Sequence, residues 1–208
     1  ATLDVLSGGR FDLGLGTGRS EPEFIATGSD PNPRGRRMTE YLEALRTLWN
    51  DPVASFEGEL YRVPPSTVAP APVQPGGPPV LLGGSADAAL RRAGRLAAGW
   101  VSRSRATFEE IARGVQIVRR AAEESGRDPD AVRVVVRAPV RPGLRDDAFP
   151  LSGDWEQIRA GAELYAAAGV TELFYDLNWD PLIGTPDADR EVARERADEI
   201  LTALAPRF

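Results

Sequence analysis

The chain of 208 residues contains no cysteine, no histidine and no lysine, so all 25 of its basic residues are arginines. Within this sequence, these absences exclude a Ser-His-Asp triad, a cysteine nucleophile, a Schiff-base lysine and the lysine of a P-loop. The usual zinc site of cysteine and histidine is excluded too, and we expect no bound metal. Carboxylates, hydroxyls, arginines and the backbone are left to carry the function.

Long apolar runs are also missing, because no segment approaches the ~20 residues that a membrane span needs. The sequence shows no signal peptide, and without cysteines it carries no disulfide evidence for secretion. We therefore expect a soluble cytoplasmic protein with no membrane partner. The 25 basic and 31 acidic residues are interspersed and give a net charge of -6. No basic face for nucleic acid is present, so nucleic acid is not an expected partner.

Short apolar segments alternate with longer amphipathic ones, the pattern typical of a parallel α/β protein. The strands are predicted at residues 10–16, 79–82, 99–102, 132–140 and 170–177. Helices are predicted at 36–50, from about 85, at 107–125, from 152 or 154 to 168, and at 187–204. The first residues are predicted as the last turns of a helix that Gly8 and Gly9 close, and Thr107 is predicted as an N-cap that forms a capping box with Glu110. Residues 20–35 are predicted as a loop and 55–63 as a hairpin. The proline-rich residues 64–79 are predicted as a long surface loop, with a lid or rim over a site as the alternative. We expect residues 1–208 to form a single domain.

Glycines crowd the end of the first predicted strand, in the stretch FDLGLGTGRS. Gly14, Gly16 and Gly18 are spaced two apart, and Thr17 lies between the last two. A run with so little side chain fits either a tight turn or a backbone that a ligand approaches closely. The pattern by itself leaves both interpretations open.

A second glycine turn follows the buried strand at 79–82 and consists of Gly83, Gly84, Ser85 and Ala86. A helix is predicted to begin near Ser85. Free backbone N–H groups at a helix start, the positive end of its dipole and a serine hydroxyl suit a phosphate group. The alternative is that Ser85 is an ordinary N-cap above a tight turn.

Several segments together resemble the luciferase-like monooxygenase family, and within it the branch that depends on the deazaflavin coenzyme F-420. They are ATLDVLSGGRFDLGLGTGRSEPEF, RGRRMTEYLEALRTLW, FEGELYRV, PVQPGGPPVLLGGSADAALRRAGRLAAGW and LSGDWEQIRAGAELYAAAGVTELFYDLNWDP. The resemblance implies a (β/α)8 TIM barrel in which the strand at 10–16 is the fourth of eight. We therefore expect this chain to carry the last five strand-helix units, and three more to precede Ala1.

The resemblance also implies where the coenzyme binds. Its contacts map onto Gly16, Thr17 and Gly18, and its phosphate maps onto Gly83, Gly84, Ser85 and Ala86. Arg19 stands where the family's sugar-phosphate dehydrogenases have a glutamate acid, which argues against that reaction because an arginine is no acid. Arg19 is predicted either to pair with the coenzyme's phosphate or anionic tail, or to be an ordinary solvated arginine.

The candidates for the substrate pocket are Asn178, Trp179 and Asp180, which follow the last predicted strand. The alternative for Trp179 is packing beneath a loop. No catalytic residue is assigned, because the family's acid and base groups often lie on the early strands. The carboxylates of Glu21, Glu23 and Asp176 are present but carry no assignment.

The resemblance implies an oxidoreductase that transfers a hydride between coenzyme F-420 and a small organic substrate, and a homodimer is expected. An FMN-dependent monooxygenase is the first alternative, since the two coenzymes share the ring, the ribityl chain and the phosphate. A non-catalytic subunit of paired barrels is the second. A phosphate-binding isomerase or aldolase is disfavoured, because the sequence lacks lysine and histidine.

Overall fold

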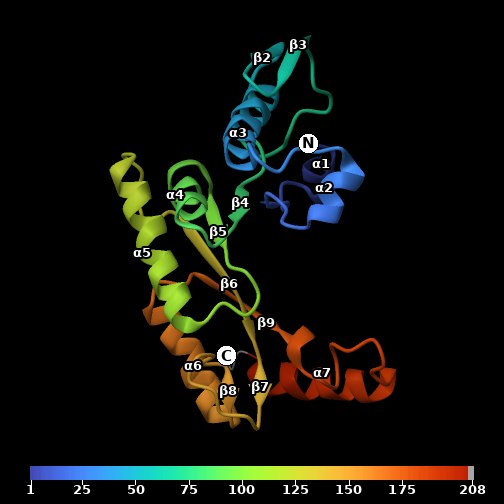
Figure 1. The fold of residues 1–208 in the computed structure, drawn as a ribbon, viewed down its shortest axis with the longest axis vertical. Coiled ribbons are helices and arrows are strands. Elements are labelled where there is room, and N and C mark those ends of the chain that lie inside the picture. Colours follow the sequence, from blue (N-terminus) through green and yellow to red (C-terminus); the bar gives the residue numbers. More distant parts are fainter. Residues whose placement is uncertain (206–208) are drawn as a thin grey trace. The chain divides into compact units, whose positions relative to one another are not determined.

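The computed structural model describes residues 1–205, which form two compact units. The first unit comprises Ala1–Trp100 and Val118–Val132, and the second comprises Val101–Ile117 and the chain from Arg133 onward. Figure 1 shows the elements coloured along the sequence. Within the described part of the chain, no helix combines the length and the apolar character that crossing a bilayer requires.

The first unit contains α1 (Thr2–Ser7), β1 (Leu13–Leu15), α2 (Glu21–Thr27), α3 (Arg34–Asn50), β2 (Ala54–Glu57), β3 (Arg62–Ser66), β4 (Val80–Gly83) and α4 (Asp87–Leu96). Strands β2 and β3 form an antiparallel hairpin. Strand β1 pairs with β4 in parallel, and β4 is followed in the sheet by β5 (Gly99–Val101). Strand β5 and helix α5 (Phe108–Glu124) are each divided between the two units.

The second unit contains β6 (Arg133–Pro139), β7 (Arg141–Pro142), β8 (Ser152–Gly153), α6 (Trp155–Ala167), β9 (Glu172–Asp176), the 3-10 helix η1 (Leu177–Trp179) and α7 (Arg190–Leu204). Its sheet order is β5-β6-β9, and β6 and β9 run parallel. Three consecutive valines of β6, Val134, Val135 and Val136, are almost fully buried. A β-branched run of this kind is typical of a strand that is covered on both faces.

Local signals explain where several helices begin and end. Gly8 closes α1 in the left-handed conformation with a φ of 64°. Thr107 and Glu110 form a capping box at the start of α5, because the Glu110 N–H donates to the Thr107 hydroxyl at 3.2 Å and the Thr107 N–H donates to the Glu110 carboxylate at 2.8 Å. Both features are predicted from the sequence and are confirmed. Asp154 and Gln157 form a second capping box at α6.

Residues 21–27 are predicted as loop but form helix α2, so that prediction is wrong. Pro22 stands in the first turn, where its missing N–H does no harm, and Gly28 ends the helix in the left-handed conformation with a φ of 64°. The loop predicted from residue 64 begins later, because Pro64 and Pro65 belong to β3. That strand has one neighbour, so a proline there breaks no central ladder.

The proline-rich segment after β3 is tied to α1 by one carboxylate. Asp4 is fully buried, and its carboxylate accepts hydrogen bonds from the Val73 N–H at 2.7 Å and the Gln74 N–H at 3.0 Å. The Gln74 side chain donates both to Asp4 at 2.8 Å and to the Phe11 carbonyl at 2.7 Å. This loop therefore has a defined place beside β1, despite its lack of regular structure.

The parallel sheet of five strands is as expected, and it does not close into a barrel within residues 1–205. Among residues 1–205, β1 pairs only with β4 and β9 pairs only with β6, so the sheet has two open edges. The short pair of β7 and β8 and the 3-10 helix η1 are not predicted from the sequence. That residues 1–208 form one domain, and that three units precede Ala1, both stay predictions.

Candidate cofactor site

The two glycine turns lie at one end of the first unit's sheet. The parallel register pairs Leu13 with Val80 and Leu15 with Leu82, so β1 and β4 end side by side. Continuing that register by one residue places Gly16 next to Gly83. Residues 16–19 and 83–86, all predicted as coenzyme contacts, therefore leave the sheet at the same edge.

The glycines of this edge fall into two groups when a Cβ atom is placed on each. At Gly14 and Gly16, no described atom outside the adjacent residues lies within 4 Å of that Cβ, and φ is not positive at either residue. At Gly18, φ is +70° and the Cβ would lie 3.1 Å from the Phe24 ring. The turn therefore requires glycine at position 18, whereas neither conformation nor packing requires it at 14 or 16.

The turn from Gly83 to Ala86 is held by the buried Trp100, whose indole N–H donates to the Gly84 carbonyl at 2.8 Å. Gly84 has a φ of +138°, and a Cβ there would lie 2.7 Å from Ala89, so this glycine is also structurally required. The interpretation of Ser85 as an N-cap is wrong, because Ala86 holds that position and no side chain caps the helix.

Polar groups at this edge are available to a ligand. Within residues 1–205, no hydrogen bond engages the Ser85 hydroxyl or the N–H groups of Ser85 and Ala86. The half-buried Thr17 hydroxyl and the exposed Arg19 guanidinium likewise bond to no described residue. Unpaired N–H groups in front of helix α4, at the positive end of its dipole, form a suitable site for an anionic group.

The second unit brings together polar residues at the end of β9. Asp176 is 5% exposed and its carboxylate accepts from Arg137 at 3.2 Å and from the Asn178 amide at 2.9 Å. Burial acts to raise the pKa of Asp176, but hydrogen bonds from Ser104 and Asn178 and the charge of Arg137 outweigh it, so that the pKa lies below its ordinary value. Asp176 is therefore ionised at neutral pH.

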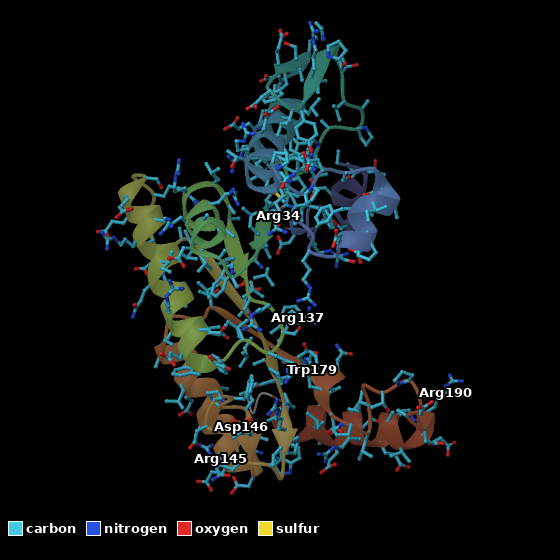
Figure 2. The ribbon with its side chains drawn as sticks, viewed as in Figure 1. Arg34, Arg137, Arg145, Asp146, Trp179 and Arg190 are labelled. Atoms are coloured by element: carbon cyan, nitrogen blue, oxygen red, sulfur yellow. The ribbon has the colours of Figure 1, made fainter. Side chains whose placement is uncertain are left out.

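A cavity of about 220 Å³ lies beside this carboxylate and is lined by Arg137, Phe174, Tyr175, Asp176, Leu177 and Asn178. Arg137 and Phe174 are directly paired across β6 and β9, and both side chains are exposed on the same face. Trp179 is 42% exposed, and the Arg105 guanidinium lies 4.8 Å from its ring. Figure 2 labels Arg137 and Trp179 in this unit.

The structure thus gathers the eight predicted coenzyme contacts at one edge of the first unit, and places Asn178 and Trp179 in the second unit. Asn178 lines the cavity, whereas Trp179 and Asp180 do not, and Asp180 accepts a hydrogen bond from Arg196 at 2.9 Å. The roles of Trp100, Arg137 and Phe174 were not predicted from the sequence. A signal for Arg137 was present in the sequence, because a charged residue interrupts the apolar run of the strand predicted at 132–140.

The fold is that of a parallel α/β protein, and the polar groups that are available to a ligand lie directly after the ends of its strands. More narrowly, the chain belongs to the luciferase-like monooxygenase family, whose model matches residues 1–149. An uncharacterized protein of Mycobacterium tuberculosis is 30% identical over 205 residues, which cover 99% of this chain and 63% of that protein. The pyrimidine monooxygenase RutA of Escherichia coli is 32% identical over 183 residues, covering 83% of this chain and 47% of RutA.

This chain therefore spans about half to two-thirds of the length of these relatives. Among solved structures, it resembles the coenzyme F-420-dependent tetrahydromethanopterin reductase of Methanopyrus kandleri, with a TM-score of 0.72 and 20% identity over 93% of this chain and 74% of the reductase. It also resembles an F-420-dependent secondary alcohol dehydrogenase, with a TM-score of 0.75 and 15% identity over 99% of this chain and 73% of the dehydrogenase. At these identities, the likeness establishes the fold.

Proposed function

We propose that this protein is an oxidoreductase that transfers a hydride between coenzyme F-420 and a small organic substrate. The observation that carries the proposal is the edge formed by β1 and β4. At this edge, neither packing nor backbone conformation requires glycine at positions 14 and 16. The adjacent turn offers backbone N–H groups that no described residue engages. The fold similarity to two F-420-dependent enzymes supports the choice of coenzyme.

The residues of this edge fit a flat coenzyme that carries a phosphate. The Ser85 hydroxyl and the N–H groups of Ser85 and Ala86 hold the phosphate, with the dipole of α4 behind them. Gly16 leaves room for the ring or its side chain, and Thr17 offers one hydroxyl to it. The exposed Arg19 pairs with a further anionic group. When bound, the deazaflavin supplies the hydride chemistry, while the protein orients it and keeps water out.

The substrate pocket is proposed to include Asn178 and Trp179, together with the pair of Arg137 and Phe174. Asp176 orients Asn178 and Arg137 through its hydrogen bonds. Because its pKa is lowered, Asp176 acts there as an acceptor and not as the proton donor of the reaction. No residue of this chain is assigned as the catalytic acid. We also propose that the protein acts as a homodimer in the cytoplasm.

An FMN-dependent monooxygenase is the second candidate function, favoured by the 32% identity to the pyrimidine monooxygenase RutA over 83% of the chain. Titration of the protein with F-420 and with FMN, followed by absorbance and fluorescence, separates the two. We expect tight binding of F-420 and weak binding of FMN. The reverse order contradicts the first proposal and supports the second.

Ser85→Asp tests whether the turn holds the phosphate in either case. A carboxylate at this position repels the phosphate, so we expect affinity for the coenzyme to fall about tenfold or more. Ser55→Asp, on an exposed position of β2, is the matched control and is expected to bind like the wild type. Equal affinities of the two variants would show that the coenzyme phosphate lies elsewhere.

A further inference from the structure

The first unit has a second cavity, at the opposite end of β4 from the glycine turn. It has a volume of about 390 Å³ and adjoins Val80, the first residue of β4. Three arginines line it: Arg46 from α3, Arg95 from α4 and Arg127 from the segment after α5. None of the described residues that line this cavity carries a carboxylate. We call it the arginine cavity.

Two of these arginines are fixed in place by the last turn of α4. The Arg127 guanidinium donates to the carbonyls of Gly94 and, at 2.7 Å, of Ala97, and the Arg46 guanidinium donates to the carbonyl of Leu96. The carbonyl end of a helix carries about half a negative charge. These carbonyls therefore accept hydrogen bonds from Arg46 and Arg127, but they do not neutralise the two positive charges.

The third arginine adds to this excess of positive charge. The Arg95 side chain is exposed and forms no ion pair or hydrogen bond with residues 1–205. Burial and, next to it, the charge of Arg46 lower the pKa of Arg127, so Arg46 and Arg127 are close enough to repel each other. The charge of an anion bound between Arg46 and Arg127 would offset that repulsion. The anion could also accept hydrogen bonds, because a guanidinium has five N–H donors and Arg127 uses only part of its set.

We propose that the arginine cavity binds a compact multivalent anion that carries phosphate or carboxylate groups. Guanidinium groups match both kinds of anion through paired hydrogen bonds. Because three guanidinium groups converge on the cavity from different segments, we expect the ligand to carry more than one negative charge. The site is separate from the proposed coenzyme site, since it lies at the start of β4 and residues 83–86 lie at its end.

Trp49 makes this site observable, because it lines the same cavity and its ring lies against Gly77. Titration with inorganic pyrophosphate and with citrate at constant ionic strength is expected to change the tryptophan fluorescence in a saturable way. Trp49→Phe is expected to remove that change, which assigns the signal to this cavity. Saturation by one of the two anions, or by both, supports the proposal and identifies the preferred group.

The decisive variant is Arg95→Ala, because Arg95 is exposed and the loss of its side chain leaves the packing intact. We expect about tenfold weaker binding of the anion, the usual effect of losing one charged hydrogen-bonding partner. Arg91→Ala is the matched control, since Arg91 lies on the same helix, pairs with Asp87 and does not line the cavity. It is expected to bind like the wild type.

Several results would overturn the proposal. One is the absence of saturable binding of either anion, and another is equal weakening by Arg91→Ala and Arg95→Ala, which indicates only general attraction to positive charge. Ser85→Asp separates this site from the glycine turn, and it is expected to leave the Trp49 signal unchanged. Loss of that signal in Ser85→Asp would place the anion at the coenzyme turn and contradict an independent site.

Discussion

Gly16→Val separates a glycine kept for a ligand from one kept for the fold. No described atom outside the adjacent residues lies within 4 Å of a Cβ atom at Gly16, and φ is not positive there. We therefore expect the free energy of unfolding to change by less than about 0.5 kcal/mol, the usual range for surface positions. In the bound state, the valine side chain occupies the space assigned to the coenzyme, so affinity should fall by at least about tenfold, or ~1.4 kcal/mol.

Urea unfolding and fluorescence titration with F-420 measure these two quantities on the same samples. Gly18→Val is the matched control, because a φ of +70° and the Phe24 ring at 3.1 Å make any side chain there unfavourable. We expect it to lower stability by about 1 to 3 kcal/mol. The reasoning about Gly16 is refuted if Gly16→Val unfolds as easily as Gly18→Val, or if it binds the coenzyme as tightly as the wild type.

Three further predictions concern the fold of each unit. Gly94→Ala is expected to lower stability by about 1 to 3 kcal/mol in urea, because its Cβ would clash with the Val118 carbonyl oxygen; an unchanged midpoint would contradict this contact. Hydrogen bonds from Gln74 hold the pKa of Asp4 below its ordinary value, so the stabilisation by this carboxylate is present above that ordinary value and is lost as the pH falls through the folded value. Asp4→Asn should therefore differ from the wild type at pH 7 and converge with it in acid, whereas a constant difference would argue against ionisation. Thr107→Ala should cost about 1 kcal/mol by removing the α5 cap, and Thr107→Ser should restore most of it.

Much of the chain organisation is readable from local patterns. Gly8 and the pair of Thr107 and Glu110 mark helix ends correctly, because caps are made by residues within a few positions of each other. The same local logic failed at residues 21–27, where glycine and proline on either side suggested a loop. There Pro22 and Gly28 delimit a short helix, and these residue types are common to both outcomes.

The position of the candidate coenzyme site could be predicted from the sequence, but its three-dimensional shape could not. Its glycines follow two predicted strands, which is visible in the sequence. Their separate roles were not visible, because Gly18 meets Phe24 and Gly84 meets Ala89 only after the chain has folded. The carboxylate of Asp176 likewise gains Arg137 and Ser104 from segments that are distant in the sequence, and both help to lower its pKa.

By itself, the sequence determined the chemical groups available, the order of the five parallel strands and the long helices, and membership of the luciferase-like family. Those properties depend on residue types and on spacing along the chain. Tertiary structure alone decided which glycines leave open space, and that Arg46, Arg95 and Arg127 line one cavity. The reason is physical: the room around a Cβ atom and the sum of nearby charges depend on residues brought together from distant positions, which no local pattern records.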